Sequence, residues 1–285
     1  MKRPFILFFN LLICVLSTVA QTDTTTPSLL SERLKSQVLV IGHRGGFDSN
    51  YPENSLALFD FTTNNGTNPM IGLEIDIRKS ATGSLYLMHD PTVNRTTNGT
   101  GDITQLQDTY LNGLQLKDSK GQSTGQKIPL FSDLLKRYQN KPVVLMLDIK
   151  GPIIEEVLHL VQQYEMEEQC LILTFTPENT QTALKHSKNA MISTLITSEK
   201  DFQALAAYNE HFTRMAAYIR KDIDPQLLKV LIESKITILT DVLEIDKQPF
   251  IPHEVTFYQD VLRKNKVAIL VTDFPQFVSK HLQGQ

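Results

Sequence analysis

Two histidines stand at points of this 285-residue sequence where a short apolar stretch ends. His43 and Arg44 follow the stretch 38–42, and His89 follows a later one. Imidazole changes charge near neutral pH, so the two histidines are candidates for a general acid and a general base. A guanidinium presents a planar fork to phosphate, which makes Arg44 a candidate phosphate contact. A single buried histidine is more often structural, but two beside carboxylates favour catalysis.

Three acidic residues lie in two other apolar stretches. Glu74 and Asp76 alternate with apolar residues, so both carboxylates point to one face of a strand. Two adjacent carboxylates repel each other unless a cation lies between them, and oxygen ligands suit a hard cation such as Ca²⁺ or Mg²⁺. Asp148 would complete a site of three carboxylates, and Lys150 would meet a phosphate oxygen. The alternatives are an exposed polar strand face and a local ion pair between Asp148 and Lys150.

These groups act together only if the elements that carry them bring their ends to one place. Near-continuous apolar runs indicate strands buried on both faces, as in a parallel sheet covered by helices. The expected strands are 38–42, 71–77, 85–88, 143–149, 171–175, 192–197, 216–219, 236–240 and 267–272. The expected helices are 53–63, 131–138, 153–165, 178–186, 200–210, 225–233, 254–265 and 275–281.

Eight of these strands with their intervening helices predict an α/β fold of the (β/α)8 TIM-barrel type, in which catalytic groups occupy the C-terminal ends of the strands. The strand 85–88 breaks the alternation and is expected to be a local elaboration. The segment 91–127 is rich in Thr, Asn and Gly and has no clean period. Long irregular segments are usually functional, so we expect a small insert over the C-terminal mouth. A doubly wound sheet is the rival fold, but the Gly-rich nucleotide turn is missing.

The N-terminal end has the pattern of an export signal. Lys2 and Arg3 precede the apolar run 5–16, and Ala20 closes a group of small residues that suits a signal peptidase. We expect an exported protein, periplasmic or secreted, with no stable membrane insertion after cleavage; an uncleaved membrane anchor is the alternative. The expected domains are a signal peptide at 1–20, a linker at 21–36 and the barrel at 37–285, with its insert at about 91–127.

The composition limits the partners. A content of 41% hydrophobic and 21% charged residues suits a globular protein with a sizeable core. The net charge of −3 shows no basic excess, so we expect no nucleic-acid partner. Of the two cysteines, Cys14 falls within the signal and Cys170 within an apolar run, so we expect no internal disulfide and a buried structural thiol.

Taken in order, the motifs of this sequence resemble those of the glycerophosphodiester phosphodiesterase family. Each motif is weak alone, whereas the ordered set, which spans Val38 to about Phe277, is specific. The matching stretches are His43-Arg44-Gly45, Pro52-Glu53-Asn54-Ser55, Glu74-Ile75-Asp76, His89-Asp90, Arg95-Thr96-Thr97-Asn98-Gly99, Ile128-Pro129, Asp148-Ile149-Lys150 and Thr272-Asp273-Phe274-Pro275.

The resemblance implies a metal-dependent hydrolase of lipid metabolism that cleaves glycerophosphodiesters to an alcohol and glycerol 3-phosphate, with Ca²⁺ or Mg²⁺ as cofactor. It implies His43 and His89 as the acid–base pair, with His89 as the acid. The further residues that it implies are the metal ligands Glu74, Asp76 and Asp148, and the substrate and phosphate contacts Arg44, Lys150 and Glu53, the last as a supporting polar group.

The sequence departs from the family pattern at two points. Asp148 stands where the family usually has a longer Glu. The family commonly carries a Trp near the substrate on a late strand, here 236–241, whereas this chain has no Trp.

Two other functions stay open: a related barrel phospholipase that acts on inositol lipids or lysolipids, and a barrel that binds a phosphorylated ligand without turnover. The pairs Glu74–Asp76 and Asp148–Lys150 favour the glycerophosphodiester substrate, and the intact set of ionisable residues favours catalysis. The head group, the metal, the choice between a cyclic intermediate and direct attack by water, and the oligomeric state are left open by the sequence.

Overall fold

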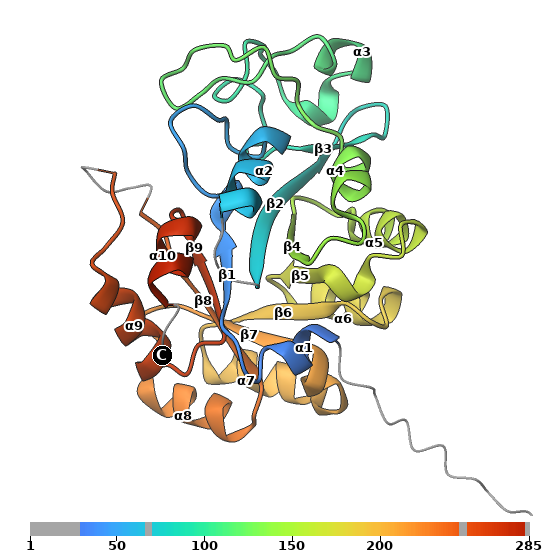
Figure 1. Ribbon diagram of the computed structural model, residues 1–285. Coiled ribbons are helices and arrows are strands. Elements are labelled where there is room, and N and C mark those ends of the chain that lie inside the picture. The colour runs from blue at the N-terminus through green and yellow to red at the C-terminus, as the bar shows by residue number, and fades with distance from the viewer. Residues whose placement is uncertain (1–28, 66–69, 245–249, 283–285) are drawn as a thin grey trace, which may run out of the picture.

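The computed structural model describes residues 29–65, 70–244 and 250–282 (Figure 1). The predicted signal peptide and the first part of the predicted linker, up to residue 28, lie outside these ranges.

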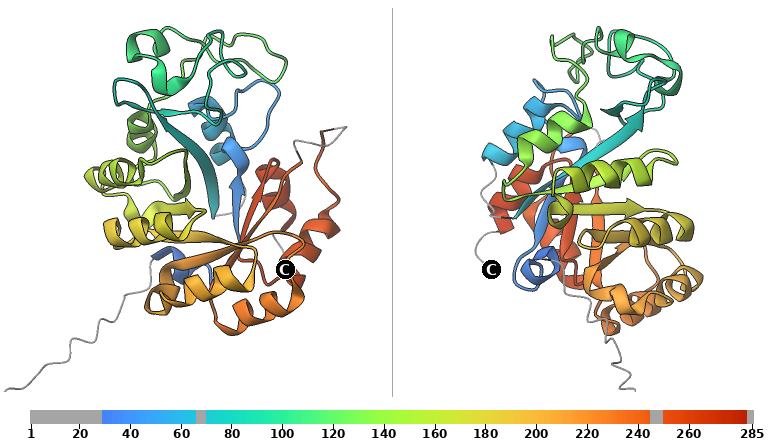
Figure 2. Two further views of the ribbon diagram at one scale, coloured as in Figure 1. Left: turned by 180° about the vertical axis from the view of Figure 1, so that it is seen from behind. Right: turned by 90° about the vertical axis from the view of Figure 1, so that its right-hand side faces the viewer.

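Eight parallel strands form a closed barrel. Strand β1 pairs with β9 on one side and with β2 on the other, and this closes the sheet. The TIM-barrel prediction is therefore confirmed, and Figure 2 shows the helices around the outside of the sheet. The barrel strands are β1 Leu39–Gly42, β2 Ile71–Lys79, β4 Val143–Ile149, β5 Cys170–Thr174, β6 Met191–Ile196, β7 Met215–Ile219, β8 Thr237–Val242 and β9 Ile269–Thr272.

The barrel interior is filled by side chains from alternate positions of the strands. Leu39 and Ile41 of β1 and Val144 and Met146 of β4 belong to one buried cluster inside the ring. Side chains two residues apart share a face, so the next interior position after Met146 is Asp148. This alternation places a polar layer on top of an apolar one at the C-terminal end of the barrel.

The expected elaboration after β2 is also present. Strand β3, Leu85–Leu87, pairs antiparallel with the last residues of β2 and stays outside the closed ring. The segment 91–127 follows it and contains the short helices η2 Ile103–Gln105 and α3 Asp108–Leu111. The segment has a small apolar cluster of its own, and in Figure 1 it lies beyond the C-terminal end of β2.

Most outer helices match the predicted ranges. Helix α8 begins after the N-cap Asp224, whose carboxylate accepts hydrogen bonds from two backbone N–H groups, and Pro225 suits the first helical position. No helix within the described ranges combines the length and the apolar character needed to cross a membrane. The helices are α2 Leu56–Asn65, α4 Phe131–Tyr138, α5 Ile154–Gln163, α6 Pro177–His186, α7 Glu199–Ala206, α8 Pro225–Glu233, α9 Val255–Lys264 and α10 Pro275–Leu282.

Two helix boundaries differ from the prediction by three or more residues. The helix expected at 53–63 begins only at Leu56, because Asn54 has a left-handed backbone with a φ of 55°. The helix expected at 200–210 ends at Ala206, and a separate 3₁₀ segment, η4 Asn209–Arg214, follows it.

The predicted linker at 21–36 differs from the structure in its second half. Leu29–Arg33 form helix α1, and Leu30 and Leu34 are buried in the same cluster as the barrel interior. In Figure 1 helix α1 lies at the opposite end of the barrel from the insert. These leucines remove apolar surface from water at the N-terminal end of the barrel, so this stretch belongs to the folded domain.

Candidate active site

Three carboxylates meet at the C-terminal ends of β2 and β4. Glu74 and Asp76 point to the interior from β2, and the strand register places Asp148 of β4 beside Asp76. All three are buried, and one oxygen from each lies within 4.8 Å of the others. The structure thus brings the three predicted metal ligands together.

The burial of these acids makes their charges costly. Burial raises the pKa of Glu74 to about 7; the charge of His43 opposes this shift, and the nearby charges of Asp76 and Asp148 add to it. The pKa of Asp148 is also raised, chiefly by burial. Asp76 behaves differently, because Lys150, His89 and Asn54 outweigh the effect of burial and lower its pKa.

These three residues fit a divalent cation. The Oδ1 atom of Asp76 is fully buried and accepts no hydrogen bond, although the Nζ of Lys150 lies 3.0 Å away. A cation between the carboxylates would offset their repulsion and use this oxygen. An all-oxygen donor set of this kind is the one that hard cations prefer.

Lys150, predicted as a phosphate contact, lies against the same carboxylates. Its Nζ is 2.5 Å from Oδ2 of Asp148, so the ion pair considered from the sequence is present in this arrangement. The ammonium group thus contacts two of the three predicted metal ligands, Asp76 and Asp148.

His43 is fixed by a partner far away in the sequence. Its Nδ1 donates a hydrogen bond of 2.8 Å to Oδ1 of Asp273, which follows β9. Its Nε2 lies 3.7 Å from Oε2 of Glu74. Burial would lower the pKa of His43, but Glu74 and Asp273 outweigh it and raise the pKa to about 9. The ring is therefore held with Nε2 toward the carboxylate cluster.

A sharp turn after β1 carries Arg44 to the site. Arg44, Gly45 and Gly46 all have positive φ angles, and a Cβ on Gly45 would approach the ring of Phe59 to 2.6 Å. Only glycine avoids this contact while adopting that backbone. The turn lets the backbone N–H of Arg44 donate to Oε2 of Glu74 at 3.1 Å.

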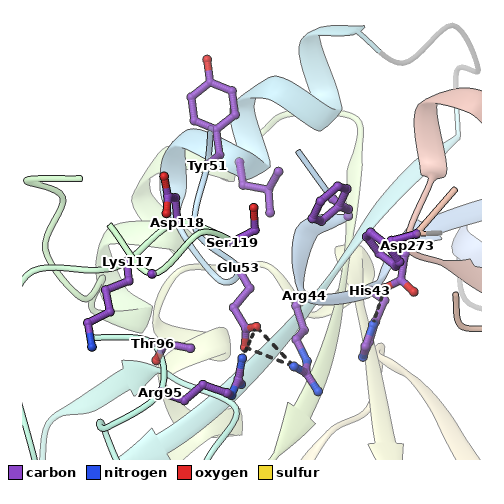
Figure 3. A pocket seen from close by; sticks show the side chains of 15 residues that line it. His43, Arg44, Tyr51, Glu53, Arg95, Thr96, Lys117, Asp118, Ser119 and Asp273 are labelled. Atoms are coloured by element: carbon purple, nitrogen blue, oxygen red, sulfur yellow. Dashed lines mark hydrogen bonds and ion pairs between the residues drawn. The ribbon is translucent and has the colours of Figure 1, made fainter. Parts of the chain in front are cut away.

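His89 belongs to a chain of charged side chains that reaches into the insert. Its Nδ1 donates to Oδ1 of Asp90 at 2.8 Å. Arg95 of the insert donates to Oδ2 of Asp90 at 2.7 Å and to Oε2 of Glu53 at 2.6 Å. Glu53 also accepts from Arg44 at 3.2 Å, so its carboxylate lies between two guanidinium groups (Figure 3). The pKa of Asp90 is lowered chiefly by its hydrogen bonds with Arg95.

An open cavity of about 560 Å³ extends from this site. It runs from His43 and Arg44 to Lys117 and Asp118 of the insert, with Phe250 on another side. Figure 3 shows Arg44, Glu53 and Arg95 along this cavity, with His43 and Asp273 at one end. The insert thus forms one wall of the cavity that begins at His43 and Arg44.

Sequence reasoning gave no role to three residues that shape the site: Asn54, Arg95 and Asp273. The side chain of Asn54 donates to Oδ2 of Asp76 at 2.7 Å and accepts from the backbone N–H of Asp76 at 3.2 Å. All three lie within the motifs that carry the family resemblance. The motifs therefore indicated that the three residues are important, but no local pattern in the sequence identifies the residue that each of them contacts.

The chain is similar to known proteins along most of its length. Residues 43–222 match the glycerophosphoryl diester phosphodiesterase family. A glycerophosphodiester phosphodiesterase of Caldanaerobacter subterraneus is 30% identical over 146 residues, which cover 49% of this chain and 58% of that protein. The human glycerophosphodiester phosphodiesterase 1 is 30% identical over 151 residues, 50% of this chain and 44% of that protein. The chain spans about half the length of the curated relatives it matches.

Solved structures share the fold. A glycerophosphoryl diester phosphodiesterase from Parabacteroides distasonis superposes with a TM-score of 0.76 at 24% identity, over 88% of this chain and 91% of that one. A phosphodiesterase from Oleispira antarctica, solved with the product sn-glycerol-3-phosphate, gives a TM-score of 0.66 at 20% identity, over 86% of this chain and 97% of that one.

Proposed function

This chain belongs to the glycerophosphoryl diester phosphodiesterase family, and from this premise we propose that it hydrolyses glycerophosphodiesters to an alcohol and glycerol 3-phosphate. The observation that carries the proposal is the cluster of Glu74, Asp76 and Asp148 between two histidines at the barrel mouth. The charge of His43 acts on Glu74, and that of His89 acts on Asp76 and Asp148. The Oleispira relative bound to sn-glycerol-3-phosphate supports the same product here.

Glu74, Asp76 and Asp148 would hold a divalent cation, and we propose Ca²⁺ or Mg²⁺ for it. When bound, the cation supplies positive charge that stabilises negative charge developing on the phosphoryl oxygens. Asp148 is one methylene shorter than the Glu usual in the family, but one of its carboxylate oxygens lies within 4.8 Å of an oxygen of Glu74 and of Asp76.

Each of the two histidines has one ring nitrogen available for proton transfer, because the other one is hydrogen-bonded to a carboxylate. In both rings a carboxylate accepts the Nδ1 proton, Asp273 for His43 and Asp90 for His89. This leaves Nε2 as the atom that takes or gives a proton. One histidine removes a proton from the attacking oxygen and the other protonates the leaving alkoxide.

The assignment of the acid stays a prediction. The charges around His43 raise its pKa to about 9, so its ring carries a proton at neutral pH in the metal-free protein. The family resemblance assigns the acid to His89 instead. A leaving-group experiment, described in the Discussion, separates the two assignments.

Arg44 and Lys150 provide positive charge for the diester, which carries one negative charge. Arg44 is oriented through its ion pair with Glu53, which is in turn held by Arg95. The Nζ of Lys150 lies against Asp76 and Asp148, so its ammonium group is placed beside the proposed cation ligands, where it would pair with a phosphate oxygen.

The proposed activity is tested on the chain from Gln21 onward. With Ca²⁺ or Mg²⁺ present, it should release glycerol 3-phosphate from glycerophosphocholine, glycerophosphoethanolamine or glycerophosphoinositol. Excess chelator and Asp76→Asn should each abolish the release, because both remove the cation. A Lys229→Met variant, changed at an exposed position of α8, serves as the control. No release from any of the three substrates would disprove the proposal.

We also propose that the protein is exported, on the basis of Lys2, Arg3, the apolar run 5–16 and Ala20. Mass spectrometry of the protein outside the cytoplasm should find an N-terminus at Gln21 or within a few residues of it. An intact Met1 in that fraction would contradict signal cleavage.

A further inference from the structure

A second cavity opens at the barrel mouth, away from the first one. Its volume is about 500 Å³, and it lies over the C-terminal ends of β5 to β8, whereas the first cavity lies beside β1, β9 and the insert. Phe175, Leu195, Tyr218 and Asp241 line it from successive strands. None of the groups to which we assign proton transfer or cation binding lines this cavity.

The second cavity is lined mainly by apolar and aromatic side chains. Phe175, Leu243 and Phe257 around it are 46%, 36% and 40% exposed, which is unusual for such large apolar residues. The ring of His253 stacks on Phe257 with centroids 4.1 Å apart. Apolar surface gathered in a concave place marks a binding site.

The charges around this cavity balance each other. Arg220 and Lys221 line it together with Asp222 and Asp241. The hydroxyl of Tyr218 donates to Oδ2 of Asp241 at 2.5 Å, which satisfies one of these acids. A charged head group would therefore gain little from this cavity, whereas a hydrocarbon chain would cover the exposed rings.

Tyr218 connects the second cavity to the carboxylate cluster. It occupies an interior position of β7, two residues after the buried Ala216. Burial and Asp241 raise the pKa of Tyr218, and the charges of Glu74 and Asp148 add to the shift. His43 lines the first cavity and Tyr218 lines the second one, and both occupy interior positions at the same barrel mouth as the carboxylate cluster.

We propose that the second cavity binds a hydrocarbon chain carried by one ester arm of the diester, so that chain-bearing glycerophosphodiesters are the preferred substrates. The proposal rests on the proposed function. A phosphodiester has two arms, and a phosphate at the carboxylates can direct one arm into each cavity. The chain is either an alkyl group on the alcohol side or an acyl group on the glycerol, as in a lysophospholipid.

Two substrate series test this. The first contains glycerophosphodiesters of methanol, butanol and octanol; the second contains glycerophosphocholine and its hexanoyl and octanoyl monoesters, each below its micelle-forming concentration. In one series kcat/KM should rise by roughly two- to fourfold per added methylene, the range expected when apolar surface leaves water. The series that rises identifies the arm. A flat response in both series, with glycerophosphocholine hydrolysed normally, would overturn the inference and leave the proposed function standing.

Variants test whether the dependence of kcat/KM on chain length arises in this cavity. Leu243→Ser and Phe257→Ser should each lower the kcat/KM ratio between the longest and shortest substrate by about tenfold, since each removes apolar surface equivalent to a few methylenes. Ile232→Ser is the matched control, because Ile232 is 37% exposed on α8 and lines neither cavity. An unchanged ratio in both cavity variants, or an equal loss in the control, would refute the assignment. If no substrate is hydrolysed at all, the proposed function fails and the inference falls with it.

Discussion

Each candidate catalytic histidine is paired with an aspartate, and the two pairs are built differently. Asp273, the partner of His43, is buried and also accepts a hydrogen bond from the backbone N–H of Glu244 at 2.6 Å. Asp90, the partner of His89, is tied to Arg95 of the insert. The first pair belongs to the buried part of the barrel mouth, whereas the second depends on the insert. We therefore expect the two histidines to respond differently when the insert is altered.

The two histidines give the first prediction. His43→Ala and His89→Ala should each lower kcat on a glycerophosphodiester by roughly 10²–10⁴-fold, the usual effect of losing an acid or a base. A nitrophenyl diester needs little protonation of its leaving group, so only the variant that lacks the acid should recover on it. Recovery of His89→Ala would support His89 as the acid, and recovery of His43→Ala would reverse the assignment. His159→Ala, an exposed position on α5, is the control.

If either His43→Ala or His89→Ala retains near wild-type turnover while folded, the acid–base pair is wrong. The melting temperature of each variant separates loss of chemistry from loss of fold.

Asn54 gives the second prediction. Its side chain bonds both to the carboxylate and to the backbone N–H of Asp76, so it orients a proposed metal ligand. Asn54→Gly keeps the left-handed backbone at low cost and removes the amide. The cation Kd, measured by calorimetry, should rise about 10–100-fold, as is usual when a group that orients a ligand is lost. Asn50→Ala, an exposed change in the same loop, should leave the Kd unchanged; equal affinity in both variants would argue against this role.

Side chains of two outer helices, α2 and α4, link these helices to each other. Asp60 of α2 accepts hydrogen bonds from Nε of Arg137 at 2.7 Å and from the hydroxyl of Tyr138 at 3.1 Å, both from α4. Burial would raise the pKa of Asp60, but these partners outweigh it and lower the pKa.

The link between α2 and α4 gives the third prediction. The folded state lowers the pKa of Asp60, so its stabilising effect is present above about pH 4 and is lost as the pH falls through the folded-state pKa. Asp60→Asn should lower the free energy of unfolding at pH 7 by about 1 kcal/mol or less, since the pair is partly exposed. Denaturant unfolding should find this difference shrinking as the pH is lowered toward 3.

Asp133→Asn is the matched control, because Asp133 is exposed on α4 and forms no ion pair within the described ranges. Equal loss in both variants, or a loss from Asp60→Asn that does not depend on pH, would contradict the assigned role of the link.

Closure of the barrel brings the ionisable side chains of the site close to one another. It brings the interior positions of β1, β2, β4, β7 and β9 into one layer, where charges from distant parts of the chain act on one another. The cost of crowding three carboxylates there is visible in the raised pKa of Glu74, about 7, which burial causes and the neighbouring acids increase. A divalent cation would remove this cost.

The cation gives the fourth prediction. In the metal-free protein, Glu74 has a higher pKa folded than unfolded, so stability falls as the pH rises from about 4.5 through about 7. Saturating Ca²⁺ or Mg²⁺ should raise the melting temperature, because the ion binds the folded site. The rise should be larger at pH 8 than at pH 5, as protons no longer compete with the ion. Asp148→Asn should lose most of this rise, and a rise that is equal at both pH values would contradict a carboxylate site.

The sequence by itself determined the features that depend on local geometry. A period of two residues places Glu74 and Asp76 on one face of a strand, and alternating apolar runs and amphipathic segments specify the order of strands and helices. The family motifs indicated which residues form the site. These inferences hold because backbone geometry relates neighbours in the chain in the same way in any fold.

Only the tertiary structure decided which distant groups meet. Asp273 lies 230 residues from His43, and no local pattern couples them. The left-handed Asn54 delays the start of α2, and burial of Leu30 makes a helix of part of the predicted linker, because contacts across the barrel override local preference. Closure of the barrel also gathers the exposed side chains of Phe175, Leu243 and Phe257 around one cavity. These residues are far apart in the sequence, so this apolar surface exists only in the folded barrel.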